Sequence, residues 1–175
     1  MTHITSRTKK CSRKDAHVRL MQAESFVETA QLVADETTDE SNPGVSASLA
    51  VLAGIAASDA ACCARLGIRS RGQAHSDAVT LLGTVIPHGA NMAKDSQRLL
   101  NRKDDSHYGV TFVSSADALR MIGWAKRIVA SARVAVEAQR LTVWCAACTN
   151  ALYKFCCAES FIAVSSGCHC TPTNQ

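Results

Sequence analysis

Apolar side chains recur at steps of three and four residues along most of the chain, which is the period of a helix with one buried face. The clearest example comprises Leu49, Leu52, Ala53, Ala56, Ala60 and Cys63. The pattern predicts five helices, at Asp15–Asp35, Ser46–Leu66, Ala74–Ile86, Asn91–Lys103 and Ser114–Gln139. Because short connections join them, we expect an all-α, up-down bundle of four to five helices.

The same pattern assigns buried faces to the first and last helices. The two apolar sets are Val18, Met21, Val27 and Leu32, then Leu119, Ile122, Ala125, Ile128, Val129, Ala132 and Val136. Gly67 and Pro87 are typical helix stops, and Ser114 with Asp117 resembles a capping box that starts the last helix. We expect His107–Val113 to be an extended connector.

The two ends of the chain depart from the helical pattern. We expect Met1–Lys14 to be a flexible basic arm, residues 15–140 to be the bundle, and residues 141–175 to be an irregular Cys-rich tail. The tail has little charge and six cysteines: Cys145, Cys148, Cys156, Cys157, Cys168 and Cys170. It is either a sixth apolar helix over Leu141–Ala158 with a loose end, or a segment without an evolved fold.

Composition supports a helical core and leaves the partner open. Apolar residues make up 47% of the 175, which excludes a wholly disordered chain, and the 5% aromatic content favours packed helices. The net charge of +4 is mild. Six basic residues and one acidic residue in positions 1–20 precede six acidic residues in positions 21–45. These segments either screen each other or include an arm that weakly attracts phosphates.

We expect a cytoplasmic protein that is not embedded in a membrane. The basic N-terminal residues are not followed by the apolar stretch of a signal peptide. Val45–Ala64 is weakly charged but contains Asp59, and Leu141–Tyr153 is shorter than a membrane-spanning helix. Disulfides are not expected in that compartment, so Cys62 and Cys63 are interpreted as small core residues.

The sequence predicts no cofactor and no metal site in the bundle. The tail offers an alternative, because Cys145, Cys148, Cys168 and Cys170 supply enough thiolates for a tetrahedral zinc ion. Their spacing is irregular, so zinc binding is the less favoured interpretation.

The strongest candidate for chemistry is Arg102 with His107, within LLNRKDDSHYG. Histidine exchanges protons near neutral pH, and arginine stabilises negative charge on phosphate, which suffices for metal-free RNA cleavage by a 2′-OH. Lys103 is a competing cation, and Asp104 would orient His107. On a regular helix five residues rotate by about 140°. The pair therefore meets only if the helix ends between them or two copies share the site; otherwise this is a solvated turn.

A second cluster surrounds the predicted end of the second helix. Four cations would form a rim that binds backbone phosphates: Arg65, Arg69, Arg71 and His75. Such cations also cap helix C-termini, which is the favoured interpretation for Arg65. Asp59 lies on the apolar stripe, where a carboxylate is costly unless it is paired. We therefore predict a buried ion pair for Asp59, with a secondary role in orienting the site.

Ala53–Leu82 and Leu99–Gly109 resemble the HEPN (higher eukaryotes and prokaryotes nucleotide-binding) domain of small bacterial proteins. As an architecture the resemblance covers Val18–Gln139 and implies a helical up-down bundle that is commonly dimeric. Many members are metal-independent ribonucleases with an R-x4–6-H motif, often the toxin of a toxin–antitoxin pair. Arg102 and His107 match that motif, and Lys103 follows the arginine as a polar residue often does.

The resemblance implies an endoribonuclease that cleaves RNA by 2′-OH attack. It also implies a homodimer and a possible antitoxin or nucleotidyltransferase partner. The alternative is a non-catalytic interaction module with the same bundle, because some members lack the motif and do not cleave RNA. The Cys-rich tail is not part of the family pattern.

Overall fold

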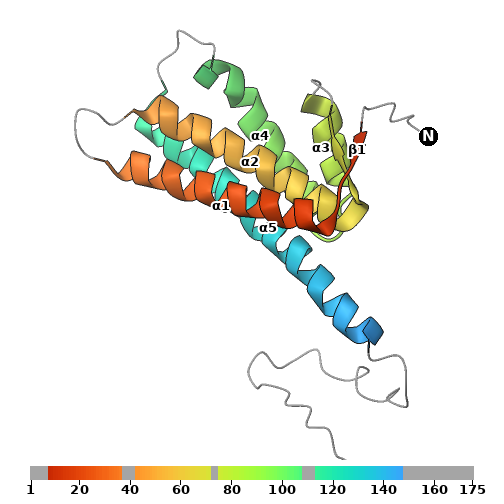
Figure 1. The fold of residues 1–175 in the computed structure, drawn as a ribbon. Coiled ribbons are helices and arrows are strands. Elements are labelled where there is room, and N and C mark those ends of the chain that lie inside the picture. Colours follow the sequence, from red (N-terminus) through yellow and green to blue (C-terminus); the bar gives the residue numbers. More distant parts are fainter. Residues whose placement is uncertain (1–7, 37–41, 72–74, 108–112, 148–175) are drawn as a thin grey trace, which may run out of the picture. The chain divides into compact units, whose positions relative to one another are not determined.

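The computed structural model describes residues 8–36, 42–71, 75–107 and 113–147. They form a helical bundle with one small two-stranded sheet, which confirms the all-α class (Figure 1). The elements are β1 (Thr8–Lys10), α1 (Arg13–Asp35), α2 (Pro43–Leu66), β2 (Ile68–Ser70), α3 (His75–Gly83), α4 (Gly89–His107) and α5 (Ser115–Ala147). The chain divides into two compact units, Met1–Leu141 and Thr142–Gln175. The second unit contributes only the end of α5 to the described residues.

Helices α1 and α2 are antiparallel neighbours. Near one end of the pair the Ser46 hydroxyl donates to the carbonyl of Ala30 at 2.7 Å. Near the other end Arg19 of α1 bonds Asp59 of α2. Residue numbers fall along α1 as they rise along α2, so the two helices run in opposite directions.

The same reasoning places α5 between α1 and α4. Lys126 bonds Gln31 and Arg133 bonds Glu24, so α5 runs antiparallel to α1. Asp95 of α4 bonds Arg127 of α5, and Arg102 of α4 lies beside Asp117 of α5, so these two helices are also antiparallel. Helix α4 also packs along α2, which completes an up-down arrangement of α1, α2, α4 and α5, with α3 in the α2–α4 connection.

Small residues let α2 approach its neighbours closely. Its buried residues are Ser46, Ala47, Ala50, Val51, Ala53, Gly54, Ala56, Ala57, Ala60, Ala61, Cys62, Cys63 and Ala64. A Cβ atom added at Gly54 would lie only 2.5 Å from Cδ1 of Leu99 on α4, so a side chain there requires Leu99 to move. Within the described residues, α2 is also the helix long and apolar enough to cross a membrane. However, 72% of its most apolar window is buried inside the protein.

The buried face of α1 differs from the prediction. Val27 is buried, but Val18, Met21 and Leu32 are exposed by 45%, 55% and 71%. The buried positions are Ala16, Leu20, Ala23, Val27 and Ala30. The interface selects alanine because it allows close helix packing, whereas the sequence pattern gave weight to the larger side chains. Leu52 and Leu119 are exposed for the same reason, while the other predicted positions of α5 are buried.

Several helix ends also differ from the prediction. Helix α3 ends at Gly83, before Ile86, and α4 continues through His107, so this residue is helical and does not start the expected connector. The rest of that connector, up to residue 112, lies outside the described residues. Helix α5 extends past Gln139 to Ala147, so no separate helix begins at Leu141. The remainder of the predicted tail, 148–175, is outside the described residues.

The predicted helix stop at Gly67 and the predicted helix start at Ser114 are confirmed. Gly67 ends α2 in the left-handed region at φ 67°, and its N–H bonds the carbonyl of Cys63. Before α5, the backbone N–H of Asp117 bonds the hydroxyl of Ser114 at 3.1 Å, and that hydroxyl donates to the Asp117 carboxylate at 2.7 Å. These interactions depend on residues close in sequence, which is why the pattern predicts them.

The predicted basic arm is partly folded. Residues 1–7 lie outside the described residues, but Thr8–Lys10 pairs antiparallel with Ile68–Ser70. The next residue, Cys11, forms a disulfide with Cys63 and donates its N–H to the carbonyl of Gly67. Both features correct the prediction of a flexible arm without a disulfide.

Cys62 remains a free thiol beside this disulfide. Burial, assisted by the negative charge of Asp59, raises the pKa of Cys62 to about 12. Cys62 is therefore a protonated thiol at neutral pH. Both adjacent cysteines are buried, as the sequence predicted, but Cys63 is oxidised in the disulfide.

A buried carboxylate joins α4 to α5. Asp95 is 7% exposed and accepts hydrogen bonds from Arg127 Nε at 2.8 Å, Arg127 Nη2 at 3.0 Å and Arg98 Nη1 at 2.9 Å. Burial by itself raises the pKa of Asp95, but the hydrogen bonds and charges of Arg127 and Arg98 outweigh it and lower the pKa overall. Asp95 is therefore ionised in the folded protein at neutral pH.

The disulfide should stabilise the folded state, because it closes a loop between residues 52 positions apart. We expect reduction to lower the free energy of unfolding by about 2–4 kcal/mol. The measurement is urea unfolding with and without a dithiol reductant. In Cys11→Ser the reductant should have no effect, whereas Cys62→Ala should respond like the wild type. Equal midpoints for oxidised and reduced wild-type protein would contradict the prediction.

Asp95 should make stability depend on acidic pH. Because its folded-state pKa is lowered, its contribution is complete above about pH 5 and is lost as pH falls through the unfolded value of about 3.9 towards the folded one. We expect Asp95→Asn to be about 2 kcal/mol less stable than wild type at pH 7, with the gap closing towards pH 3. Urea unfolding across this range measures the gap, and a constant difference would argue against an ionised Asp95.

Candidate nucleic-acid interface

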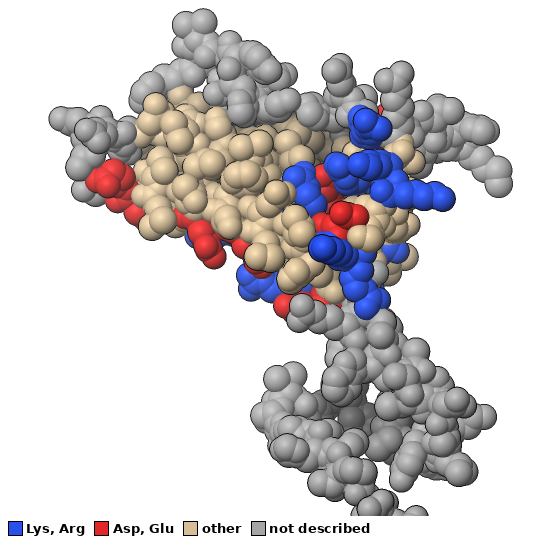
Figure 2. Space-filling view, viewed as in Figure 1, with Lys and Arg blue, Asp and Glu red and all other residues tan. Residues whose placement is uncertain are grey.

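A basic groove lies where β1, β2 and the start of α1 meet. Its volume is about 250 Å³, and its lining residues are Lys9, Lys10, Cys11, Asp15, Val18, Arg19, Gln22 and Arg69. Lysine and arginine side chains gather on the β1 end of the molecule in the view of Figure 2, whereas much of the neighbouring surface is uncharged. Four cations from three elements therefore border one groove.

Asp59 holds two of these cations in place. Its Oδ2 accepts from Arg19 Nη2 at 2.7 Å, Arg19 Nε at 3.1 Å and Arg69 Nη1 at 3.2 Å. The Asp59 side chain is 14% exposed, so the predicted ion pair is confirmed. One carboxylate thus fixes guanidinium groups from α1 and β2, and this limits the freedom they would lose on binding a ligand.

The other carboxylate in the groove is engaged in capping α1. Asp15 Oδ2 accepts from the Ser12 backbone N–H at 2.8 Å and from its hydroxyl at 2.7 Å. These bonds, the backbone one first, lower the pKa of Asp15. The four cations of the groove face two carboxylates, Asp15 and Asp59, so the formal net charge of this region is +2.

The predicted phosphate-binding residues are partly gathered here. Arg69 lines the groove, and Arg71 is exposed just after β2. His75 is the first residue of α3, but its side chain lies outside the described part of the structure. Arg65 does not serve only as a cap of α2, since its Nε donates to the carbonyl of Ile86 at 2.8 Å and ties α2 to the α3–α4 connection.

Lys9, Lys10 and Arg19 were not predicted as site residues. The sequence interpretation of the basic N-terminal run is a flexible arm, with weak attraction of phosphates as an alternative and no single residue assigned to a site. Only the pairing of β1 with β2 brings this run next to Arg69. That pairing joins segments about 60 residues apart, so local periodicity carries no trace of it.

Arg102 lies towards the opposite end of the bundle. Helix α4 starts at Gly89, close to the carbonyl that Arg65 bonds, and Arg102 follows about 20 Å along the helix axis. Its Nη2 lies 3.9 Å from Oδ1 of Asp117 at the start of α5. The structure therefore separates Arg102 from Arg69 and Arg71, and Asp59 does not orient the Arg102 region.

The helix is unbroken between Arg102 and His107. The two residues are therefore separated by about 140° around the axis of α4. The side chains of Lys103, Asp104 and His107 lie outside the described part of the structure. One of the two routes that would bring the pair together, a helix end between them, is absent from α4. A site shared by two copies is the remaining route.

The comparisons with known proteins leave these assignments to physical argument. No protein-family model matches the sequence, and no curated protein matches it either. The resemblance to HEPN domains therefore rests on the two stretches quoted above. In the described ranges, no three His, Cys, Asp or Glu side chains are grouped so that they could hold a metal ion. The candidate zinc ligands Cys148, Cys168 and Cys170 lie outside those ranges.

Proposed function

We propose that the protein binds RNA and that the basic groove holds the backbone phosphates. The observation that carries this proposal is the convergence of Lys9 and Lys10 from β1, Arg19 from α1 and Arg69 from β2. Arginine offers a planar set of donors that matches phosphate oxygens, and lysine adds a point charge. The choice of RNA as the polyanion is supported by the resemblance to HEPN domains.

The groove favours contacts to phosphates over contacts to bases. Its lining residues include no aromatic side chain on which a base could stack. Proteins that bind single strands through their bases commonly use such aromatic platforms. Binding should therefore depend strongly on salt and weakly on sequence, since counterion release dominates phosphate contacts.

Lys10→Glu tests this proposal without disturbing the Asp59 cluster. We expect about a tenfold loss of affinity for a fluorescein-labelled 12-nucleotide RNA, measured by anisotropy. The slope of log affinity against log salt should shrink by about 0.7 for each lost phosphate contact. Lys126→Glu is the matched control, because it makes the same charge change at an exposed position on α5.

The control variant should bind RNA within about twofold of wild type, since non-specific attraction falls off beyond a Debye length of about 8–10 Å. Equal losses in the two variants would show that net charge alone drives binding. Failure of the wild-type protein to bind RNA at low salt would contradict the proposal outright.

A second proposed function is metal-independent cleavage of RNA by a homodimer. The position of Arg102 supports this second proposal. Its side chain is 47% exposed near one end of the bundle, where a second copy can approach. In this proposal Arg102 of one copy and His107 of the other share a site, and the protein is the toxin of a toxin–antitoxin pair. Lys103 would contact phosphate and Asp104 would orient His107.

The chemistry requires no cofactor. His107 takes the proton of a 2′-OH, whose oxygen attacks the adjacent phosphorus, while Arg102 stabilises the developing negative charge. His107 then returns this proton to the leaving 5′-oxygen, so that the products are a 2′,3′-cyclic phosphate and a free 5′-hydroxyl and the imidazole is regenerated. DNA should be inert because it lacks the attacking 2′-OH.

Complementation between inactive variants tests the shared site. Arg102→Ala and His107→Ala should each lower cleavage of labelled RNA by 10²–10⁴-fold in excess EDTA, with Lys103→Ala less affected. An equimolar mixture should recover about a quarter of wild-type activity, because half of randomly assorted dimers carry one intact site of two. Light scattering reports the dimer, and anisotropy confirms that each variant still binds RNA.

The outcomes separate the two proposals. If the wild type cleaves RNA but the mixture stays inactive, the site is not shared between copies. If the wild type binds RNA and leaves it intact, the non-catalytic interaction module, with an antitoxin or nucleotidyltransferase as its partner, replaces the enzyme.

A further inference from the structure

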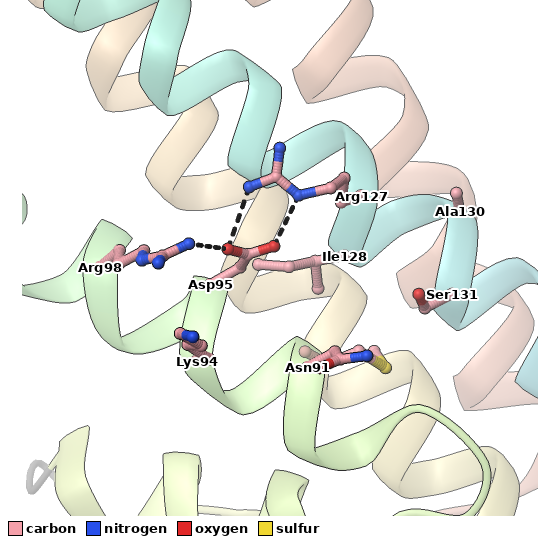
Figure 3. Close-up of a pocket in the computed structure, with 9 residues that line it drawn as sticks. Asn91, Lys94, Asp95, Arg98, Arg127, Ile128, Ala130 and Ser131 are labelled. Atoms are coloured by element: carbon pink, nitrogen blue, oxygen red, sulfur yellow. Dashed lines mark hydrogen bonds and ion pairs between the residues drawn. The ribbon is translucent and has the colours of Figure 1, made fainter.

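A second polar cavity lies between α4 and α5. Its volume is about 480 Å³, and its polar lining comes from Asn91, Lys94, Asp95 and Arg98 on α4 and Arg127 and Ser131 on α5 (Figure 3). None of these residues lines the basic groove. The volume falls in the range of small-molecule sites, about 300–1,000 Å³, and is too small for a macromolecule.

The cavity carries an excess of positive charge. Lys94, Arg98 and Arg127 face one carboxylate, Asp95, so two positive charges are not balanced by the lining residues. Asp95 is nearly buried and engages both guanidinium groups through three hydrogen bonds. Figure 3 shows Asp95 between the two arginines, and Lys94 lies on the same helix, one turn before Arg98.

The two arginines are held in place and yet remain accessible. Arg98 also lies over the ring of Trp124, 5.9 Å from its centroid, so two contacts fix its guanidinium. The side chains of Arg98 and Arg127 are nevertheless 44% and 57% exposed. Arg127 uses Nε and Nη2 on Asp95, and Figure 3 shows its third nitrogen directed away from the carboxylate.

We propose that this cavity binds a small molecule that carries a phosphate group. Fixed guanidinium groups bind phosphate oxygens with little further loss of freedom, and Lys94 supplies a third positive charge. Asn91 and Ser131 provide hydrogen-bonding groups at the far side of the cavity for the rest of the ligand. The inference stands independently of the proposed RNA binding, because it rests on different residues.

Calorimetric titration with two probes, inorganic pyrophosphate and adenosine monophosphate, tests the proposal. We expect saturable 1:1 binding of at least one probe with a Kd of about 1 mM or tighter. Binding of the monophosphate should strengthen as pH rises through about 6, where a phosphate monoester gains its second charge. Absence of saturable binding for both probes would show that the Asp95 network serves only to join α4 and α5.

Substitutions assign any binding to this cavity. Lys94→Glu should weaken it by more than tenfold with an unchanged melting temperature of the free protein, because Lys94 is exposed and makes no ion pair among the described residues. Arg98→Lys keeps the charge but loses the planar group, and should weaken it several-fold. Lys14→Glu makes the same charge change at an exposed position on α1 that lines neither the cavity nor the groove, and it should bind like wild type. Lys10→Glu should also leave binding unchanged if the probe occupies this cavity and not the basic groove. Wild-type affinity in Lys94→Glu, or a loss in Lys10→Glu, would overturn the assignment.

Discussion

The close packing of α2 against its neighbours is the constraint on which the other contacts depend. Its buried face consists almost entirely of alanine, glycine and cysteine, and Gly54 leaves room for Leu99 of α4. Small residues bring helix axes close, and this sets where the longer side chains at the edges can reach. A larger residue at position 54 would require Leu99 to move or α4 to shift away from α2.

Two carboxylates organise the polar surface around that core in the same way. Asp59 joins arginines of α1 and β2, and Asp95 joins arginines of α4 and α5. In each case a largely buried acidic side chain pairs with arginines that remain partly exposed. The arrangement provides fixed positive groups at the surface while avoiding an unpaired buried charge, which is the costly alternative.

The separation of charge within the bundle bears on function. The groove near β1 has the cations expected of a phosphate-binding surface, whereas Arg102 and His107 lie towards the other end of α4. The two proposed functions therefore draw on different ends of the bundle, and a single RNA strand would have to span the bundle or reach a second copy to use both. The disulfide from Cys11 to Cys63 lies at the end of the bundle that carries the basic groove, since Cys11 itself lines the groove.

The sequence by itself determined the helical class, the end of α2 at Gly67, the cap at Ser114 and the need for a partner to Asp59. All of these follow from interactions within a few residues or from the cost of burying a charge. Tertiary structure decided the pairing of β1 with β2, the disulfide and which arginines meet Asp59. It also placed alanine rather than Val18 or Leu32 in the core. These outcomes depend on segments far apart in the chain, whose contact free energy leaves no periodic signal in either segment alone.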